Sequence, residues 1–384
     1  MGRARTFQVM SAEAATEQDV HLARALELAA QARRGAVSPN PLVGAVIIRD
    51  SETIGEGHHA RLGDLHAERA AIEDCRSRGN DPAGATIYVS LEPCAHSGRQ
   101  PPCTEAILEA GLARVVYASD DPSEKASGRG PGMLRDGGVE VEPAAGELAA
   151  AARLLNQPFR KRARTGRPLV TLKMAASLDG FVATAEGDSK WISGESSREL
   201  VHRWRADADA VAVGIGTALV DDPLLTARDA DVVRQPTRVV FDSEARLPLD
   251  SQLMRTVDAA PLVIVIAHGA DGDRAKRLQE AGAELIVAAG RDPADRVAAA
   301  LTELGRRDVT SLLLEGGPVL AGSFAAAGEV DELRLFIAPL LLGGGRPPLE
   351  GEGAPAVGEA LRALALESEP VGDDILIRAR LREW

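Results

Sequence analysis

The sequence has few cysteines, few aromatic residues and no excess of positive charge. Three cysteines among 384 residues cannot build a disulfide framework, so a reducing cytoplasm is the expected setting. The formal net charge of -13 argues against a nucleic-acid binder, because proteins that coat nucleic acid are usually basic. The same acidic balance indicates a protein that does not seek membrane surfaces.

Long apolar runs are also missing. The longest, such as Leu262 to Ala267, are far too short to span a bilayer, and they predict buried strands instead. No apolar segment of signal-peptide length follows Arg3 and Arg5, so we expect no secretion signal. The chain does have 45% hydrophobic residues and ordinary charge, which suffices for packed cores, and its length favours two or three domains.

The first half of the chain alternates predicted strands with predicted helices. Residues 1–15 are expected to form a flexible extension, and Thr16 with Asp19 forms a capping-box pattern at the start of a helix. The elements expected after it are strands at 43–48, 85–91 and 114–118 and helices at 66–78 and 104–109. This alternation predicts an α/β sheet with helices on both faces.

A basic, turn-forming segment at residues 161–168 follows a stretch of small residues, and we place a domain boundary near residue 165. The first domain is therefore expected to span residues 16–164 and the second residues 165–384. The second region again alternates, with a helix at 197–206 and strands at 169–174, 210–213, 238–241, 262–266, 311–314 and 333–337. It is expected to be a second α/β domain, with a surface loop at and after residues 343–345.

The sharpest pattern is an H-x-E triplet at His66 and Glu68, followed by a P-C pair at Cys94 and then by Cys103. One imidazole and two thiolates are a good ligand set for zinc, and three ligands leave the fourth tetrahedral position to a catalytic water. Zinc lowers the pKa of such a water toward roughly 7. Glu68 could carry the proton from the water to a ring nitrogen and the departing amine. The pattern therefore predicts a hydrolytic deaminase.

Two features of the cysteines favour other interpretations. Zinc deaminases commonly have two residues between the paired cysteines, whereas eight residues separate Cys94 and Cys103. A structural zinc site would need a fourth ligand, for which Cys75 is the candidate. Cys75 lies nine residues after His66 on the same predicted helix, where it points to the opposite face. We therefore favour the catalytic interpretation and expect Cys75 to be a small buried residue.

The insert between the two cysteines adds His96 and Arg99 beside the expected metal site. An arginine there could hold a phosphate group, or it could be an ordinary solvated loop charge. The residues alone favour neither interpretation.

In the second half, residues 312–319 form an apolar strand that runs into a glycine-rich turn and a probable helix. Backbone N–H groups at such a helix start favour phosphate or pyrophosphate, although an ordinary tight turn is the commoner explanation. The turn lacks the G-x-G-x-x-G fingerprint, so a Rossmann domain is not supported.

Longer motifs in the first half carry a family resemblance. They are Ser38-Pro39-Asn40-Pro41-Leu42-Val43-Gly44, Gly57-His58-His59, Gly63-Asp64-Leu65-His66-Ala67-Glu68 and Leu91-Glu92-Pro93-Cys94-Ala95-His96-Ser97-Gly98-Arg99-Gln100-Pro101-Pro102-Cys103. They resemble the deaminase half of the bifunctional riboflavin-biosynthesis enzymes of the RibD family. That family has the longer cysteine spacing, so the resemblance favours a deaminase with a cytidine-deaminase-like, three-layer α/β/α fold.

The resemblance implies roles for individual residues of the first half. The zinc ligands would be His66, Cys94 and Cys103, and Glu68 would carry the proton. The residues implied near the substrate are Asn40, His59, His96 and Arg99. The family usually shows Asp-Pro-Asn-Pro near the end of this domain, where this chain has Asp121-Pro122-Ser123-Glu124, so a substrate contact from that loop is not carried over.

Motifs of the second half resemble the reductase half of the same family. They are Thr171-Leu172-Lys173, Ser177-Leu178-Asp179-Gly180, Ser189-Lys190-Trp191-Ile192-Ser193-Gly194, Arg203-Trp204-Arg205-Ala206 and the stretch from Gly216 to Arg228. The resemblance implies a dihydrofolate-reductase-like α/β domain that uses NADPH. Lys173 and Glu315 are the candidates for polar roles at the reduced carbon.

The resemblance also places the ligands of this domain. The residues implied near the cofactor are Ala175, Trp191, Thr217, Asp221, Ser243, Gly317, Pro318, Val319, Leu320, Ala321, Gly322 and Ser323. Those implied near the sugar-phosphate substrate are Ser189, Arg205, Leu225, Arg228 and Glu315. The residues themselves do not distinguish NADPH from NADH.

Together these motifs imply consecutive steps toward riboflavin. A diaminopyrimidine ribosyl phosphate would be deaminated first, and the ribosyl group of the product would then be reduced to ribityl. A cytoplasmic homodimer that associates through the reductase half is also implied. The alternative is a zinc deaminase of another base or nucleotide, fused to an unrelated reductase or nucleotide-sensing domain.

Overall fold

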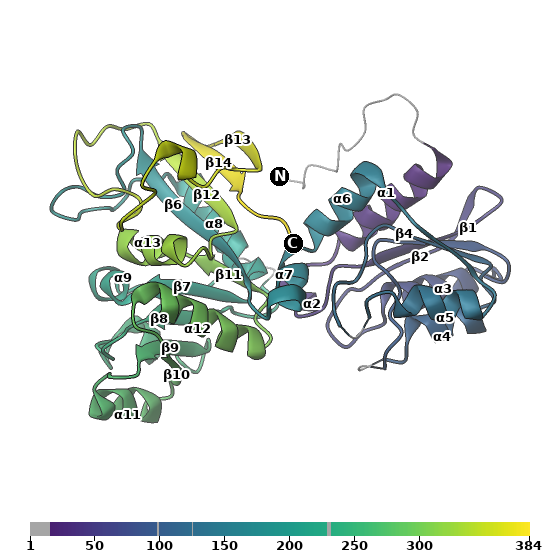
Figure 1. Ribbon diagram of the computed structural model, residues 1–384, viewed down its shortest axis with the longest axis horizontal. Helices are drawn as coiled ribbons and strands as arrows, with labels where there is room; N and C mark the ends of the chain where they lie inside the picture. The colour runs from purple at the N-terminus through teal and green to yellow at the C-terminus, as the bar shows by residue number, and fades with distance from the viewer. Residues whose placement is uncertain (1–15, 98–99, 125, 229–231) are drawn as a thin grey trace. The chain divides into compact units, whose positions relative to one another are not determined.

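The computed structural model describes residues 16–97, 100–124, 126–228 and 232–384. It has two compact units, Met1–Thr165 with Trp384, and Gly166–Glu383. Each unit is built on its own sheet (Figure 1). The extension expected at residues 1–15 lies outside the described residues. Within the described part of the chain, no helix is long and apolar enough to cross a membrane.

The sheet of the first unit has, within the described residues, five strands in the order β2-β1-β3-β4-β5. The first three pair antiparallel, whereas β3, β4 and β5 run parallel, so the carboxyl ends of these three strands share one edge. The strands are β1 (Gly44–Arg49), β2 (Glu52–His58), β3 (Thr86–Val89), β4 (Arg114–Tyr117) and β5 (Glu140–Pro143).

Helices cover both faces of this sheet, as Figure 1 shows. Alternate residues of β1 point to opposite faces, so Ala45 and Ile47 pack against α3, α4 and α5, while Val46 and Ile48 pack against α1 and α6. The predicted three-layer α/β/α domain is thereby confirmed. The helices are α1 (Glu17–Ala29), α2 (Arg34–Val37), α3 (Ala67–Ser77), α4 (Cys103–Glu109), α5 (Arg129–Asp136), α6 (Gly146–Leu155) and α7 (Gln157–Thr165).

Local predictions for this unit have mixed outcomes. The capping box is confirmed, because the Thr16 hydroxyl accepts from the Asp19 N–H at 3.2 Å and the Asp19 carboxylate accepts from the Thr16 N–H at 3.0 Å. The turn predicted from residue 161 is wrong, because α7 continues to Thr165. Arg160 and Lys161 are buried in this helix. The charge of Lys161 contributed to the turn prediction, but hydrogen bonds donated by Arg160 and the ring of Trp384 near Lys161 hold both side chains inside the unit.

The sheet of the second unit has nine strands among the described residues, in the order β10-β9-β8-β7-β11-β6-β12-β14-β13. The strands from β10 to β12 along this order are parallel, and β14 and β13 form an antiparallel hairpin at one edge. The strands are β6 (Leu169–Ser177), β7 (Ala210–Gly214), β8 (Thr237–Phe241), β9 (Leu262–Ala267), β10 (Glu284–Ala288), β11 (Ser311–Leu314), β12 (Glu332–Ala338), β13 (Ala365–Val371) and β14 (Asp374–Arg380).

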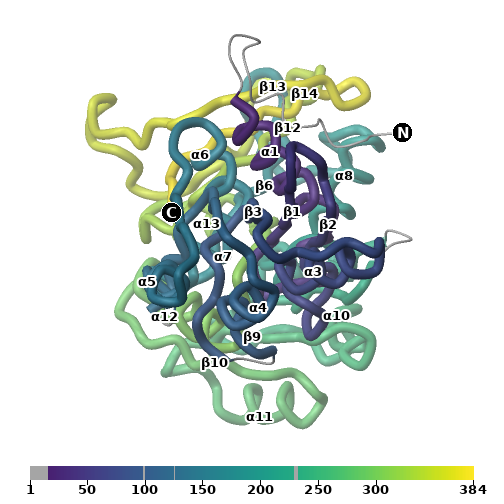
Figure 2. The backbone as a smooth tube through the Cα atoms, turned by 90° about the vertical axis from the view of Figure 1, so that its right-hand side faces the viewer, coloured from purple at the N-terminus to yellow at the C-terminus, as the bar shows by residue number. Residues whose placement is uncertain are grey.

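Two hydrophobic cores flank this sheet, one beneath α8, α9 and α11 and the other beneath α12 and α13. Figure 2 shows β10 and α11 at the end of the unit opposite to the β13–β14 hairpin. The predicted second α/β domain is confirmed, although the hairpin itself was not predicted. The helices are α8 (Glu195–Asp207), α9 (Ile215–Asp221), α10 (Gln252–Arg255), α11 (Gly272–Glu280), α12 (Pro293–Arg306) and α13 (Pro318–Ala326).

Candidate active sites

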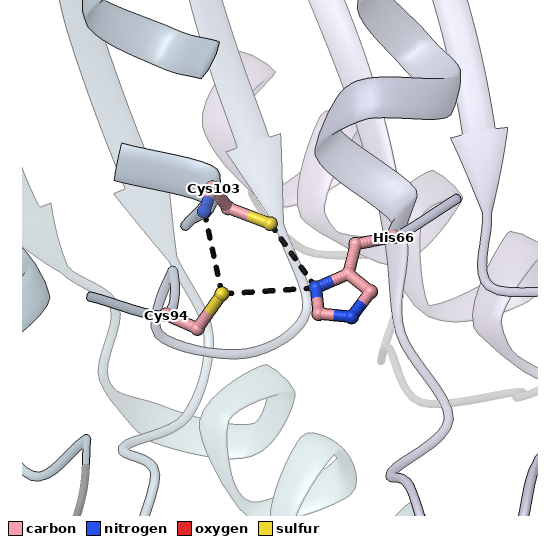
Figure 3. Close-up of side chains that lie close together, drawn as sticks. All are labelled: His66, Cys94 and Cys103. Carbon is pink, nitrogen blue, oxygen red and sulfur yellow. Dashed lines mark hydrogen bonds between the residues drawn. The ribbon is translucent and has the colours of Figure 1, made fainter. Parts of the chain in front are cut away.

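Three side chains converge where elements of the first unit begin or end (Figure 3). His66 is the N-cap of α3, Cys103 is the first residue of α4, and Cys94 lies in the loop that follows β3. The His66 Nδ1 atom lies 3.3 Å from the Cys103 Sγ and 3.7 Å from the Cys94 Sγ, and the Cys103 N–H donates to the Cys94 Sγ at 3.3 Å. All three ligand atoms lie within 4.8 Å of one another.

This geometry fits zinc. Bonds of about 2.3 Å to sulfur and about 2.0 Å to nitrogen place tetrahedral N and S ligands about 3.5 Å apart, and the two observed N···S distances bracket that value. Hydrogen bonding from Cys103 and from His66 lowers the pKa of the Cys94 thiol to about 4, so the thiolate that binds zinc is favoured. Cys75 lies outside the group and is buried in the core beneath α3, as predicted.

Glu68 lies in the first turn of α3, two residues after His66, and its side chain is buried. Burial raises the pKa of its carboxyl to about 7, and the negative charge of Cys94 adds to this effect. A carboxyl with a pKa near neutrality can both accept and release a proton at pH 7, which general acid–base catalysis requires. The predicted proton carrier therefore lies beside the metal ligands with suitable chemistry.

A chain of polar contacts extends from the metal ligands to Asn40. The His59 Nδ1 atom lies 3.0 Å from the Leu65 carbonyl and can only donate there, so its Nε2 atom accepts from the Asn40 amide at 3.1 Å. Burial lowers the pKa of His59 and favours this neutral form. The His59 and His66 rings meet edge to face, with centroids 5.5 Å apart.

His96 is half-buried, and its Nδ1 atom is buried without a hydrogen-bond partner among the described residues. The Arg99 prediction lies outside the described residues.

The sequence analysis assigned no role to two acidic residues beside this cluster. Glu92 is buried and accepts from the Gly128 N–H at 2.7 Å. Asp121 follows β4 at the same sheet edge and accepts from the Ser123 N–H at 2.8 Å. Burial raises the pKa of Asp121, and the Asp121 N–H donates to the Glu92 carboxylate at 3.5 Å. The available signal was an acidic residue directly after a buried strand, at the edge where parallel strands end.

In the second unit, predicted site residues gather at the carboxyl ends of the parallel strands. Arg205 of α8 and Glu315, directly after β11, form a two-point ion pair at 2.6 and 2.9 Å, with their side chains only 14% and 9% exposed. Burial alone would raise the pKa of Glu315, but Arg205 holds it below its usual range. Lys173 of β6 is close enough for its charge to act on Glu315. Burial lowers the pKa of Lys173. The structure thus brings both candidates for polar roles together.

The remaining predicted substrate residues are spread around this ion pair. Leu225 is buried in the core with a positive φ of 55°, whereas Arg228 and Ser189 are exposed. His202 is half-buried on α8, and the sequence analysis did not single it out. Burial lowers its pKa most, and the positive charges of Arg205 and Arg228 lower it further.

The predicted cofactor residues follow the ends of several strands. The Thr217 hydroxyl oxygen lies 3.4 Å from the position that a Cβ on Gly317 would occupy, so the starts of α9 and α13 adjoin. Asp221 forms an ion pair with Lys190 at 2.9 Å. The Arg198 guanidinium lies over the exposed ring of Trp191, 4.8 Å from the ring centroid. The other members at or near this edge are Ala175 on β6 and Ser243 after β8.

The helix after the glycine-rich turn has an exposed and a packed side. Val319 is exposed, whereas Ala321 and Gly322 are buried. A Cβ on Gly322 would lie 1.7 Å from the Glu350 carbonyl oxygen, so this glycine permits close chain packing. The Ser323 hydroxyl donates to the Val319 carbonyl at 2.9 Å. At the start of α13, Val319 is thus exposed, and Gly317 and Pro318 are half-buried.

Two protein-family models match the chain. The model described as the cytidine and deoxycytidylate deaminase zinc-binding region matches residues 16–119, and the model described as the RibD C-terminal domain matches residues 168–377.

Whole-chain relatives and solved structures agree with both matches. The chain is 39% identical to riboflavin biosynthesis protein RibD of Actinobacillus pleuropneumoniae, covering 93% of each chain, and 37% identical to that of Mycobacterium tuberculosis, covering 96% of this chain and 98% of the relative. Among solved structures, Acinetobacter baumannii RibD has a TM-score of 0.83 at 34% identity, over 96% of this chain and 99% of that one.

A second solved structure is that of a diaminohydroxyphosphoribosylaminopyrimidine deaminase/5-amino-6-(5-phosphoribosylamino)uracil reductase from Thermotoga maritima. It has a TM-score of 0.80 at 33% identity, over 95% of this chain and 99% of that one.

Proposed function

The chain belongs to the RibD family of bifunctional deaminase/reductases of riboflavin biosynthesis, and we propose how its residues divide the two reactions. The first unit deaminates the diaminopyrimidine ribosyl phosphate, and the second reduces the ribosyl group of the resulting uracil to ribityl with NADPH. The observation that carries the proposal is the zinc-ligand cluster beside buried Glu68, in a chain whose other unit matches the RibD C-terminal domain.

In the deaminase, His66, Cys94 and Cys103 would hold zinc. Zinc bound there supplies acidification of the attacking water. Glu68 relays two protons in turn, the first from the attacking water to the ring nitrogen and the second from the newly bonded hydroxyl to the leaving amine, since its pKa lies near neutrality. Asn40, His59 and His96 orient the pyrimidine, because their polar atoms border the cluster, and Arg99 is proposed to hold the phosphate.

In the reductase, Lys173 and Glu315 place opposite charges beside the carbon that is reduced. NADPH supplies the hydride. The Glu315 carboxylate fixes the Arg205 guanidinium at two points, which orients it for the sugar phosphate together with Arg228, Ser189 and Leu225. The cofactor residues proposed are Ala175, Trp191, Thr217, Asp221, Ser243 and the start of α13 from Gly317, with Leu320 to Ser323 supporting that helix.

A coupled assay tests the proposal. Purified protein is given the diaminopyrimidine ribosyl phosphate and NADPH, and ammonia release and NADPH oxidation are followed together. In Glu68→Gln both signals should vanish while zinc content stays, and NADPH oxidation should return when the deaminated uracil is supplied. Glu73→Gln, an exposed residue of the same helix, should behave as wild type. NADPH oxidation by Glu68→Gln on the undeaminated substrate would refute the assumed order.

We also propose a homodimer through the second unit. Apolar side chains are more than half exposed on and just before the edge strand β13, including Val357 (86%), Leu361 (59%), Leu364 (62%) and Leu366 (66%). Such an edge is a typical docking surface for a second copy. Leu366→Glu should give a monomer by light scattering, whereas Leu249→Glu, also exposed, should not change the mass. The cytoplasmic location stays a prediction.

A further inference from the structure

Arg160 is a buried arginine in the first unit that the mechanism above does not use. It lies on α7, and it is only 1% exposed. A buried guanidinium must find partners for its donors, because leaving them unpaired carries a large desolvation cost. Its partners therefore indicate what the residue does.

Most of these partners belong to one short segment after β4. The Arg160 Nη1 atom donates to the Asp120 carbonyl at 2.7 Å and to the Ser119 hydroxyl at 3.0 Å, and Nη2 donates to the Asp120 carboxylate at 3.2 Å. The Nε atom donates to the carbonyl of Trp384, which belongs to the same unit, at 2.7 Å. A single rigid, planar group thus fixes both backbone and side chain of residues 119–120.

The same segment is tied to the metal-ligand loop from its other side. The Glu92 N–H donates to the Ser119 carbonyl at 2.8 Å, and Glu92 precedes Cys94 by two residues. Asp121 directly follows the residues that Arg160 holds, its N–H donates to the Glu92 carboxylate at 3.5 Å, and its carboxyl is buried. A displacement of residues 119–120 would therefore move Asp121 relative to Glu92 and to the loop that carries Cys94.

We propose that Arg160 is a positioning residue of the deaminase: by clamping residues 119–120 it sets the place of Asp121 beside the zinc site. The inference rests on the deaminase activity of the first unit. The hydrogen bonds of Arg160 reach neither the metal ligands nor Glu68, so its removal leaves the proton chemistry, while the displaced Asp121 carboxyl would weaken substrate binding. A misplacement on the order of 1 Å suffices to change rates strongly.

The chain offers a matched control and a milder variant. Arg164 lies one helical turn further along α7, and it reaches the same Asp120 carboxylate only at 3.9 Å from a side chain that is 42% exposed. Arg164→Gln therefore removes an identical charge without removing the clamp. Asp120→Asn keeps the backbone contacts of Arg160 and weakens only the ion pair, on a side chain that is 53% exposed.

The experiment compares deaminase kinetics of the full-length variants with the diaminopyrimidine ribosyl phosphate, together with zinc content and reductase rate on the deaminated uracil. Arg160→Gln should raise the deaminase KM about tenfold, with its zinc content and its reductase rate unchanged. Asp120→Asn should raise the deaminase KM less, and Arg164→Gln should have the wild-type KM. A merely structural role would lower kcat, by reducing the active fraction, and leave KM unchanged.

Each outcome decides the inference. An unchanged KM in Arg160→Gln overturns it, as does an equal effect in Arg164→Gln. If Arg160→Gln does not fold, the KM of Asp120→Asn decides, and a wild-type value there overturns the proposal. Wild-type protein that releases no ammonia would instead refute the deaminase function itself, so the two failures are distinguishable.

Discussion

The Arg205–Glu315 pair gives a prediction whose size follows from the structure. Glu315→Gln keeps the shape of the side chain but removes its charge and one of the two acceptors that meet Arg205 at 2.6 and 2.9 Å. Because both side chains are mostly buried, solvent does not replace the lost partner. Loss of a charge-assisted hydrogen bond costs about 1.5–3 kcal/mol, and breaking a buried pair costs up to about 5 kcal/mol.

These energies convert into measurable shifts. For a unit of this size, about 3 kcal/mol corresponds to a fall of about 6–12 °C in Tm. The reductase kcat/KM should fall about a hundredfold, because a guanidinium freed at one end no longer orients the sugar phosphate. Calorimetry measures the unfolding of the second unit, and NADPH oxidation is followed with the deaminated uracil. Ammonia release in the same sample should stay at its wild-type rate.

The pair also predicts a pH dependence with a definite sign. Arg205 holds the pKa of Glu315 below its ordinary value, so the stabilisation is complete above about pH 4.3 and is lost as the pH falls through the lowered pKa. The Tm difference between wild type and Glu315→Gln should therefore be constant near neutrality and shrink in acid.

The matched control is Glu284→Gln, which breaks a pair with Arg307 at 2.7 Å whose side chains are 66% and 31% exposed. Exposed pairs contribute about 0–1 kcal/mol, so its Tm should move by about 4 °C at most. Equal Tm values for Glu315→Gln and Glu284→Gln would refute the assignment of a strong buried pair.

Two further predictions concern the zinc-ligand cluster and α13, the helix proposed to bind the cofactor. Cys103→Ser should lose zinc, measured by elemental analysis, and ammonia release, but it should keep reductase activity on the deaminated uracil. The control Cys75→Ala should keep its zinc. Zinc loss in both variants would contradict the three-ligand site. Gly322→Ala should raise the KM for NADPH and lower the Tm, since its methyl group meets the Glu350 carbonyl oxygen at 1.7 Å and overpacking costs about 1–3 kcal/mol. Gly272→Ala, with open space around it, is its control, and equal behaviour would refute the packing argument.

Most of the fold could be predicted because buried parallel strands are short apolar runs between helices. Strand β2 was missed because it contains Gly55 and Gly57, which suggest a turn in a sequence. The structure gives their reason: a Cβ on Gly55 would lie 2.5 Å from the Ala71 carbonyl oxygen, and one on Gly57 would lie 2.4 Å from the Ala71 nitrogen. These glycines let α3 lie directly on the strand, which brings His66 and Glu68 to the sheet edge.

The residues of the candidate sites also divide into those that a sequence pattern predicts and those that it does not. The zinc ligands and Glu68 could be predicted because each is fixed by a chemical requirement at a short sequence spacing. Arg160 could not, because its partners are distant in the sequence and a lone arginine in a basic segment predicts a solvated charge. The β13–β14 hairpin escaped prediction because β13 is an edge strand whose side chains are largely exposed, so it lacks the apolar pattern of a buried strand.

The loop that departs from the family pattern is closed by a contact that does not depend on the changed side chains. The sequence has Ser123 and Glu124 where Asn and Pro are usual, which left the role of Asp121 without support. In the structure the turn is held by the Asp121 carboxylate, which accepts from the Ser123 N–H at 2.8 Å. That donor is a backbone group, and any residue except proline supplies it at position 123. The substitutions thus leave the turn at Asp121 closed, and Glu92 on one side and Arg160 on the other hold its loop.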